Sequence, residues 1–284
     1  RTVPLYPKGQ SADKGIYENG EAVTLGPGES NGITDAETHN KYGNVSLVGD
    51  NARMEFYFPE NPNGQMVVIC PGGGYSTVCA RKEGEDVAKW MNRRGVAVCV
   101  VVYRLPNGHS NVPLTDVRNA FRYCRKHAAE WGISQIGIMG FSAGGHLAAT
   151  ASVFFTDNIT RPDFSVLIYP VIDLTHHNGT RKELVGESET LKEKYSLQNQ
   201  VGANTPRTFI ALCQDDNVVN PKSSLMYYNS LLDKGIKAEM YIFPTGGHGW
   251  GFLNEELAGR KDGLAGYRNI FGECLEKFLT DVKK

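Results

Sequence analysis

The stretch "IGIMGFSAGGHLAA" (residues 136–149) sets a serine among glycines, between an apolar run and a run of small residues that favour a helix. Within it, Gly140, Ser142 and Gly144 match the pattern G-x-S-x-G, which places a serine at a sharp turn between a buried strand and a helix. Glycine is needed there because neighbouring backbone comes too close for a side chain. Without that context the letters would describe only a glycine-rich turn. The flanking sequence favours Ser142 as a nucleophile.

The chain around this turn alternates short β-branched runs with longer segments of helical period from residue 66 onward. This alternation predicts an α/β fold, a mostly parallel sheet with helices on both faces. The strand-like runs are nearly all apolar, as expected for strands buried on both faces. Strands are expected at 66–70, 96–103, 136–139, 164–169, 208–213 and 238–243. Helices are expected at 83–95, 113–132, 221–235 and 264–282, in addition to the helix after Ser142.

The first 50 residues differ from the rest, because glycine, proline and polar residues dominate and no helical period is visible. Residues 44–59 are expected to form the first, antiparallel strands of the sheet. No internal repeat occurs, and no shift in composition after residue 66 marks a second domain. The sequence therefore predicts an extended amino-terminal arm over residues 1–43 and a single domain over residues 44–284.

Composition limits the classes of partner. The chain has 284 residues, is 40% hydrophobic, and carries 30 basic against 31 acidic residues, a net charge of -1. No run of five like charges indicates binding to nucleic acid or to a membrane surface. The longest apolar run, residues 96–103, is far shorter than the roughly 20 residues that span a bilayer. A small or neutral molecule is the expected partner, and the sequence leaves the oligomeric state open.

The six cysteines lack the short paired spacings of zinc sites. Cys70, Cys99 and Cys213 fall within expected central strands, where a free thiol packs as a small hydrophobic group. We therefore expect reduced, structural cysteines. The chain begins with "RTVPLYPKG" and not with methionine, which favours a mature product of a secreted or periplasmic protein.

The glycine-rich stretch "CPGGGYS" (70–76) follows the expected strand 66–70 directly. A serine nucleophile needs N–H donors for the oxyanion of its tetrahedral intermediate, and each donor contributes ~3 kcal/mol. The glycines allow backbone N–H groups to turn inward, so Gly73 and Gly74 are the expected donors, with Ala143 as the third. The alternative, a loop that holds phosphate, lacks both the G-K-[ST] ending and the glycine spacing of dinucleotide sites.

The general base is expected in "TGGHGWGF" (245–252), the glycine-rich loop after the last strand. His248 there gives the chain order Ser, Asp, His that belongs to this strand–turn–helix context. The alternatives are less suitable: His127 lies near a helix end, His146 is expected to pack or cap within the helix after Ser142, and His176 and His177 lie in a polar loop.

The orienting acid is expected after the strand 208–213, where "QDDNVVNP" (214–221) offers Asp215 and Asp216. Only one of the two carboxylates can reach the imidazole. The pattern D-x-x-V followed by proline and a helix favours Asp216, with Asp215 capping or solvating the turn. Asp173, which follows the strand 164–169, is the second choice.

From about residue 44 to its end, the chain resembles the α/β-hydrolase superfamily and, within it, the acetyl-xylan esterases and lipase-like carbohydrate esterases. The motifs that carry the resemblance occur in that group's order. They are "PGGGYS", "YRLP", "DVRNAFRYCRKHAAEWGIS", "IGIMGFSAGGHLAA", "PDFSVLIYPVIDL", "QDDNVVNP" and "GGHGWG". One position departs from a branch of the superfamily: the hormone-sensitive-lipase relatives carry histidine where Pro71 stands. This weakens the tie to that branch and to large lipid esters.

The resemblance implies a serine esterase that uses Ser142, His248 and Asp216, with no metal or organic cofactor. Its substrate would be a small-molecule or carbohydrate ester, most simply a short acyl group such as acetyl on xylan. The segment 170–207 is polar and charged, which favours a small lid or rim over a large apolar cap. Tyr75, Tyr103 and Trp250 flank the expected site in sequence and could stack on sugar faces or wall an acyl pocket.

Three other functions remain open on the sequence alone. A feruloyl or general carboxylesterase would differ only in its acyl pocket. A peptidase similar to prolyl oligopeptidase would use the same triad, although such enzymes usually carry a large additional domain. A catalytically inactive binding module would keep the fold without the reaction.

Overall fold

The computed structural model describes residues 1–6, 17–18, 21–22, 37–176, 178–252, 263–264 and 266–284. Within these residues, an eight-stranded sheet has the order β1-β6-β8-β7-β9-β10-β11-β12. Its strands are β1 (Thr2–Pro4), β6 (Arg53–Tyr57), β7 (Gln65–Cys70), β8 (Ala97–Val102), β9 (Gln135–Phe141), β10 (Ser165–Ile168), β11 (Thr208–Cys213) and β12 (Ala238–Phe243). Neighbouring strands from β8 to β12 pair in parallel. The β1–β6 and β6–β8 pairs are antiparallel.

The six strands expected from residue 66 onward are all present, with ends that differ by at most two residues. Every residue of β7 and β8 is buried, because these central strands are covered on both faces. Of residues 44–59, expected to form the first, antiparallel strands of the sheet, only β6 belongs to the sheet. Smaller two-stranded ribbons join β2 (Tyr17–Glu18) to β3 (Glu21–Ala22) and β4 (Thr38–His39) to β5 (Val45–Ser46).

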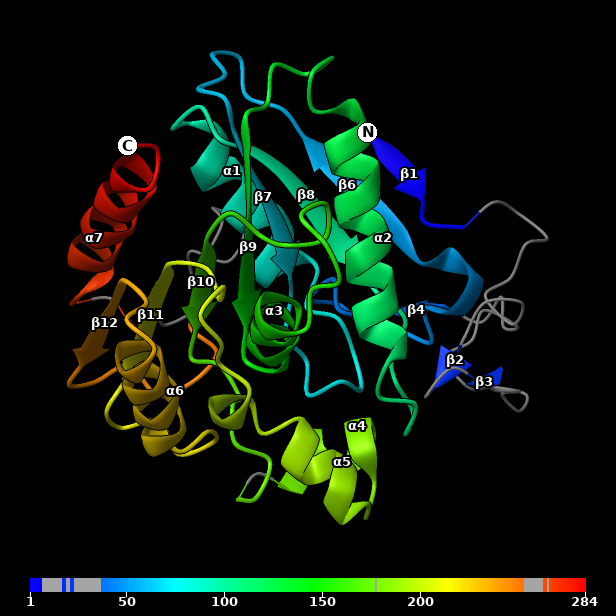
Figure 1. Cartoon of the computed structure of the whole chain (residues 1–284). Helices are drawn as coiled ribbons and strands as arrows, with labels where there is room; N and C mark the ends of the chain where they lie inside the picture. Colours follow the sequence, from blue (N-terminus) through cyan, green and yellow to red (C-terminus); the bar gives the residue numbers. More distant parts are fainter. Residues whose placement is uncertain (7–16, 19–20, 23–36, 177, 253–262, 265) are drawn as a thin grey trace.

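Helices cover both faces of the sheet, with α2 and α3 on one face and α1 and α7 on the other (Figure 1). Their bounds are α1 (Asp86–Asn92), α2 (Val112–His127), α3 (Ala143–Val153), α6 (Pro221–Asp233) and α7 (Arg268–Asp281). A π-helix, η3 (Arg81–Glu85), precedes α1 directly. Among the residues that the structure describes, we find no helix with the length and apolar character to cross a bilayer. The predicted mostly parallel sheet with helices on both faces is thus confirmed.

The segment between β10 and β11 contains helices that the sequence did not indicate. They are α4 (Asn178–Val185), α5 (Glu189–Lys194) and the 3-10 helix η4 (Leu197–Asn199). Ser188 caps α5, since its side chain accepts a hydrogen bond from the Leu191 N–H. In Figure 1, α4 and α5 lie together at one end of the molecule. Their role as a small lid or rim stays a prediction.

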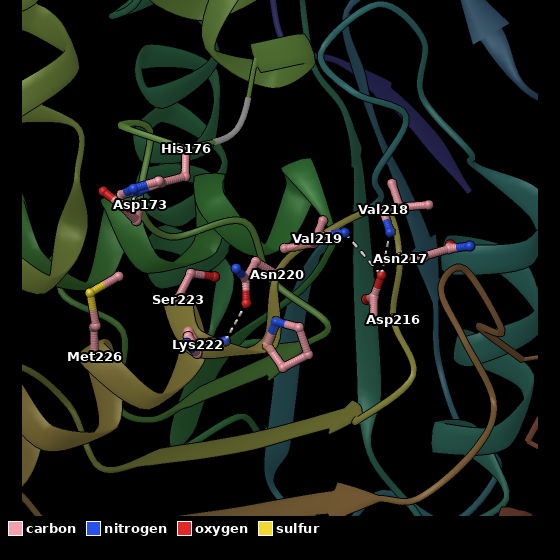
Figure 2. Close-up of a pocket in the computed structure, with 11 residues that line it drawn as sticks. Asp173, His176, Asp216, Asn217, Val218, Val219, Asn220, Lys222, Ser223 and Met226 are labelled. Carbon is pink, nitrogen blue, oxygen red and sulfur yellow. Dashed lines mark hydrogen bonds and ion pairs between the residues drawn. The ribbon is translucent and has the colours of Figure 1, made fainter.

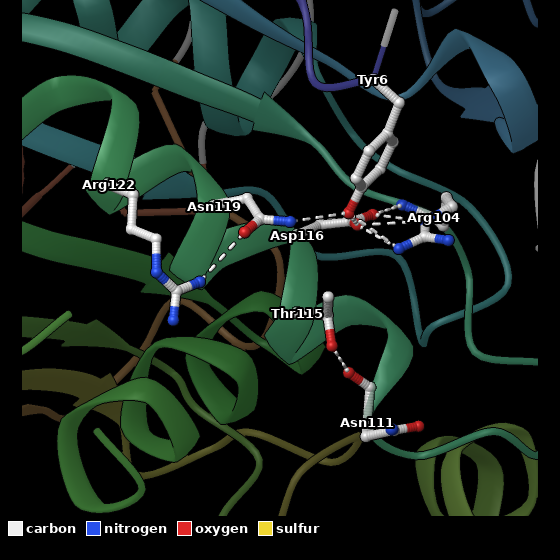
Figure 3. A network of polar contacts seen from close by, with 7 residues as sticks. All are labelled: Tyr6, Arg104, Asn111, Thr115, Asp116, Asn119 and Arg122. Carbon is white, nitrogen blue, oxygen red and sulfur yellow. Dashed lines mark hydrogen bonds and ion pairs between the residues drawn. The ribbon is translucent and has the colours of Figure 1, made fainter. Parts of the chain in front are cut away.

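The first residues of the predicted arm belong to the sheet, because β1 pairs with β6. Beyond β1, the Tyr6 hydroxyl meets a buried ion pair between Arg104 and Asp116 (Figure 3). Arg104 Nη2 lies 2.5 Å from Asp116 Oδ1, and both side chains are almost fully buried. Removing one partner of such a pair typically costs about 3–5 kcal/mol. Through Tyr6, this cluster connects the amino-terminal segment to α2 and to the residues that follow β8. Most of the remaining arm lies outside the described residues.

All six cysteines are free thiols, and Cys70, Cys99, Cys124 and Cys213 are buried. Burial raises the pKa of the Cys213 thiol to about 11 and that of Cys79 to about 12. Protonated, buried thiols pack as small apolar groups. This agrees with the structural role expected for the cysteines of the central strands.

Candidate active site

Ser142 lies at the junction of β9 and α3, with φ 53° and ψ -120°. This conformation is rare for a residue with a side chain and costs of order 1–3 kcal/mol. Packing explains the two flanking glycines: a Cβ atom at Gly140 would lie 2.1 Å from the Gly144 carbonyl oxygen, and one at Gly144 would lie 2.1 Å from that of Cys70. The strand, sharp turn and helix expected around Ser142 are therefore all present.

The strained turn is fixed by backbone hydrogen bonds. The Ser142 N–H donates to the Ile168 carbonyl at the end of β10 (3.0 Å), and the Ser142 carbonyl accepts from the Val171 N–H (3.0 Å). These bonds tie the turn to the neighbouring strand and the segment after it. The side chain of Ser142 is thereby held at the carboxyl end of the parallel strands, where the loops after β11 and β12 also lie.

Three side chains from three different loops form a continuous chain of hydrogen bonds. Ser142 Oγ lies 2.8 Å from His248 Nε2, and His248 Nδ1 lies 2.7 Å from Asp216 Oδ2. The Asp216 side chain is 1% exposed and that of His248 is 14% exposed. The structure thus brings together the serine, histidine and aspartate that the sequence indicated, although they are far apart along the chain.

The local environment keeps Asp216 ionised. Its Oδ1 accepts hydrogen bonds from the Val218 and Val219 N–H groups, each at 2.9 Å, while Oδ2 faces His248 (Figure 2 draws the two backbone bonds). Burial acts to raise the pKa of Asp216, but the hydrogen bonds from His248 and the backbone outweigh it and hold the pKa below its usual range. A carboxylate at this position accepts a hydrogen bond from Nδ1–H and so leaves Nε2 as an acceptor for the serine hydroxyl.

Asp215, the neighbouring carboxylate, supports the loop that carries His248. Its oxygens accept hydrogen bonds from the Gly246 N–H (3.3 Å) and the Gly247 N–H (2.8 Å). The sequence suggested only that Asp215 would cap or solvate its own turn. The difference arises because the ends of β11 and β12 are adjacent in the sheet, so Asp215 reaches across to the next loop.

Asp173, the second-choice acid, has other partners. It lies 2.8 Å from His176 Nδ1 and accepts hydrogen bonds from Thr175 and Gln198. Burial acts to raise the pKa of Asp173, but the bonds from Thr175, His176 and Gln198 lower it to about 2. Asp173 is thus a buried carboxylate whose hydrogen bonds come from a local cluster, and the imidazole of His248 is bound by Asp216 instead.

The remaining candidate histidines lie away from Ser142 Oγ or outside the described residues. His146 is buried in α3, with Nδ1 3.0 Å from the Tyr75 hydroxyl and Nε2 2.8 Å from the Tyr195 carbonyl oxygen. His127 stacks on Trp131. His177 is not among the residues that the structure describes.

The glycine loop after β7 lies directly against the nucleophile. A Cβ atom at Gly72 would come within 3.0 Å of Ser142 Cβ, and the Gly72 N–H donates to Glu83 Oε2 at 2.7 Å. The next two glycines, Gly73 and Gly74, have φ of 134° and 64°. In the described part of the chain, the N–H groups of Gly73, Gly74 and Ala143 donate no hydrogen bond. These are the three groups that the sequence singled out as oxyanion donors.

The three aromatic residues expected to stack on sugar faces or to wall an acyl pocket are all buried. Tyr75, Tyr103 and Trp250 are 1%, 0% and 4% exposed, so none can offer a ring face to a sugar. The Tyr103 hydroxyl donates to the Pro71 carbonyl oxygen (2.5 Å), and the Trp250 ring packs against Tyr169. Burial of these rings removes their apolar surface from water and stabilises the fold. Through these contacts the rings pack against the residues that carry the site.

A cavity of about 580 Å³ opens beside Asp216. Figure 2 shows Asp173 and His176 on one side of it and the beginning of α6 on the other. Its lining residues are Asp173, His176, Asp216, Asn217, Val218, Val219, Asn220, Pro221, Lys222, Ser223 and Met226. The cavity therefore presents both polar groups and the apolar side chains of Val218, Val219 and Met226 next to the acid.

A serine on a strained turn between a parallel strand and a helix, beneath loops that carry a histidine and an aspartate, defines the α/β-hydrolase class. The solved structure of an acetyl ester-xyloside bifunctional hydrolase from Caldicellulosiruptor lactoaceticus supports this class. It superposes with a TM-score of 0.76 at 29% identity and covers 100% of this chain and 96% of its own. Residues 54–231 match the BD-FAE family. The chain belongs to the BD-FAE family.

Two curated relatives agree with this assignment. An acetylxylan esterase from Xylanibacter ruminicola is 38% identical over 229 residues, 76% of this chain and 47% of the relative. Endo-1,4-beta-xylanase B from Butyrivibrio fibrisolvens is 36% identical over 212 residues, 67% of this chain and 33% of the relative. The chain thus spans half or less of the length of these relatives. The resemblance to α/β-hydrolases and carbohydrate esterases expected from the sequence motifs is confirmed.

Proposed function

We propose that the protein is a serine esterase that removes short acyl groups, in particular acetyl groups, from xylan or related carbohydrates. The observation that carries the proposal is the continuous hydrogen-bond chain from Asp216 through His248 to Ser142 Oγ. The substrate class is supported by the names of the relatives, an acetylxylan esterase, a xylanase and an acetyl ester-xyloside hydrolase.

In the first half-reaction, Ser142 Oγ attacks the ester carbonyl carbon and passes its proton to His248 Nε2. The carbonyl oxygen becomes an oxyanion, for which Gly73, Gly74 and Ala143 N–H groups are the donors. The tetrahedral intermediate then collapses: the bond to the sugar oxygen breaks, and that oxygen leaves with the proton from Nε2. The acyl group remains on Ser142 as an ester.

The second half-reaction repeats these steps with water. Water gives a proton to His248 Nε2 and attacks the acyl carbon, and a second oxyanion forms at the same donors. Collapse returns the Nε2 proton to Ser142 Oγ and releases the carboxylic acid. Asp216 stays ionised throughout and stabilises the imidazolium that forms in each half. Its two backbone hydrogen bonds and lowered pKa suit it to this role.

The test compares three substrates: acetylated xylan, methyl ferulate and a proline dipeptide amide, with release of acetate, ferulate and amine as the readouts. We expect release of acetate to dominate. Predominant release of ferulate or of amine would replace the proposed substrate class with one of those activities. No turnover of any substrate, together with no labelling by a fluorophosphonate probe, would identify a binding module.

The control is Ser142→Ala, which removes the attacking oxygen and keeps the fold. Its acetate release should fall to the background rate, and the fluorophosphonate probe should no longer label the protein. Wild-type turnover by this variant would contradict the assignment of Ser142 as nucleophile.

A further inference from the structure

A buried carboxylate that the proposed reaction does not use lies behind the site. Glu83 is 3% exposed, and each of its oxygens accepts one hydrogen bond. Oε2 accepts from the Gly72 N–H in the glycine loop (2.7 Å), and Oε1 accepts from the Tyr169 hydroxyl (2.8 Å). Buried carboxylates are rare unless their oxygens are bonded in this way, so this side chain has a specific place in the structure.

The second partner, Tyr169, connects Glu83 to the histidine loop. Its hydroxyl accepts a hydrogen bond from the Gly251 N–H (2.9 Å), and its ring lies 4.7 Å from the His248 ring, centroid to centroid. Burial and the neighbouring Glu83 raise the pKa of Tyr169 well above its ordinary value, so the phenol keeps the proton that it donates. A single path of hydrogen bonds therefore runs from Gly72 through Glu83 and Tyr169 to Gly251.

The π-helix that carries Glu83 also contacts the histidine loop through Lys82, the residue before Glu83. Lys82 Nζ donates to the Gly249 carbonyl oxygen (2.5 Å), and the Lys82 carbonyl accepts from the Phe252 N–H (3.2 Å). π-helical turns are uncommon and often occur at functional sites. Here the turn packs between the glycine loop and the histidine loop.

These two loops follow strands that are not neighbours in the sheet. The glycine loop follows β7 and the histidine loop follows β12, and three strands, β9, β10 and β11, separate them in the sheet. No direct strand pairing therefore connects the two loops, and the sheet relates them only through the three strands between them. The Glu83–Tyr169 path is a direct polar connection between them, and it runs beneath the reacting groups.

We propose that Glu83 and Tyr169 are positioning residues that hold the oxyanion donors and His248 in register around Ser142. The inference rests on the proposed function. Neither side chain reaches the substrate. Together they set where Gly73 and Gly74 lie relative to the imidazole, and a small displacement of either loop would weaken stabilisation of the transition state more than binding of the ester.

The test uses Glu83→Ala, Glu83→Gln and Tyr169→Phe in the full chain, with p-nitrophenyl acetate as substrate. Active sites are counted by fluorophosphonate titration, so kcat refers only to competent enzyme. We expect Glu83→Ala to lower kcat ~10²-fold with KM near the wild-type value, because removing an oxyanion donor outright costs ~10²–10³-fold. Glu83→Gln should recover part of this loss, since its amide oxygen still accepts from the Gly72 N–H.

The matched control is Glu85→Gln, on the same π-helix. The Glu85 side chain is 40% exposed and forms a surface ion pair with Lys89 (2.8 Å), so kcat should stay near the wild-type value. The double variant of Glu83→Ala and Tyr169→Phe should be about as slow as the slower single variant, because the two residues act as one unit.

The outcomes separate the inference from the proposed function. If the wild-type protein hydrolyses no acetyl ester, both the inference and the proposed function are overturned. Wild-type turnover with an unchanged kcat per titrated site in Glu83→Ala, Glu83→Gln and Tyr169→Phe would overturn the inference alone, even if the melting temperature fell. A loss in kcat that Glu83→Gln partly restores, with an unaltered Glu85→Gln, would establish the positioning role.

Discussion

Two pairs of aspartate and histidine lie at the ends of neighbouring parallel strands and look alike in their own geometry. After β10, Asp173 Oδ2 lies 2.8 Å from His176 Nδ1, and after β11, Asp216 Oδ2 lies 2.7 Å from His248 Nδ1. Both carboxylates are buried, and both have a lowered pKa. A search for close carboxylate–imidazole contacts would find both pairs.

The pairs differ in what the second ring nitrogen faces. His176 follows Asp173 by three residues and its side chain is 79% exposed, so the pair is a local turn at the surface. His248 comes from the loop after β12, and its Nε2 lies 2.8 Å from Ser142 Oγ. The comparison teaches that proximity of acid and imidazole is common, and that a nucleophile at the other nitrogen distinguishes a catalytic arrangement.

The largest expected effect separates the two imidazoles. His248→Ala removes the general base, so kcat for p-nitrophenyl acetate should fall ~10⁵–10⁶-fold. His176→Ala should leave kcat near the wild-type value, because its ring does not contact Ser142. Initial rates with active sites counted by titration give the measurement. Comparable losses of kcat in both variants would show that the two aspartate–histidine pairs do not differ in catalytic role.

The next largest effect separates the two carboxylates. Asp216→Asn keeps the shape of the side chain but donates where a proton acceptor is needed, which favours the wrong imidazole tautomer, so we expect a ~10⁴-fold loss in kcat. Asp173→Asn should retain activity. The reverse order of losses would move the role of orienting acid to Asp173, the second choice from the sequence.

A smaller effect is expected at Asp215, the residue beside the acid. Asp215→Ala removes the acceptor for the Gly246 and Gly247 N–H groups and loosens the histidine loop. We expect kcat to fall about tenfold, well short of the loss at Asp216, since a loosened support misplaces the base only part of the time. Full activity in this variant would show that the loop is fixed by its other contacts.

The smallest effect concerns stability and its pH dependence at Asp173. The folded pKa of about 2 lies below the ordinary value of 3.8, so the cluster stabilises the fold at any pH above about 4. This contribution is lost as the pH falls from about 4 to about 2. The wild type should therefore exceed Asp173→Asn in free energy of unfolding at neutral pH, and urea unfolding should show the difference shrinking below pH 4. A difference that grows on acidification would have the wrong sign.

Much of the fold followed from local patterns in the sequence. The expected strands and the helices after Ser142, Asn111 and Asn220 are present because buried strands must be apolar and helices must carry an apolar stripe. The site residues could be predicted from the sequence for a related reason. Parallel strands have their carboxyl ends at one edge of the sheet, so residues that follow successive strands lie close together there. The helices α4 and α5 were not expected, since their segment is too polar to show a clear period.

Supporting residues were beyond the reach of the sequence. In the sequence, Glu83 is an acidic residue at the start of an expected helix, and Tyr169 is the last residue of an expected strand. Neither pattern indicates that the two side chains form a hydrogen bond with each other. The aromatic residues Tyr75, Tyr103 and Trp250 flank the site in sequence, but they are buried. The position of a residue along the chain does not predict whether its side chain points into the site or into the core.

The sequence by itself determined the order of the strands along the chain, the glycine-flanked turn at Ser142 and the small set of residues that could serve it. These features depend on short-range sterics and on apolar periodicity, which neighbouring residues encode. Only the tertiary structure decided that His248 binds Asp216 and that Glu83 links the two loops. Such contacts join segments tens to more than a hundred residues apart, and they depend on how the strands are ordered in the sheet and not on any local pattern.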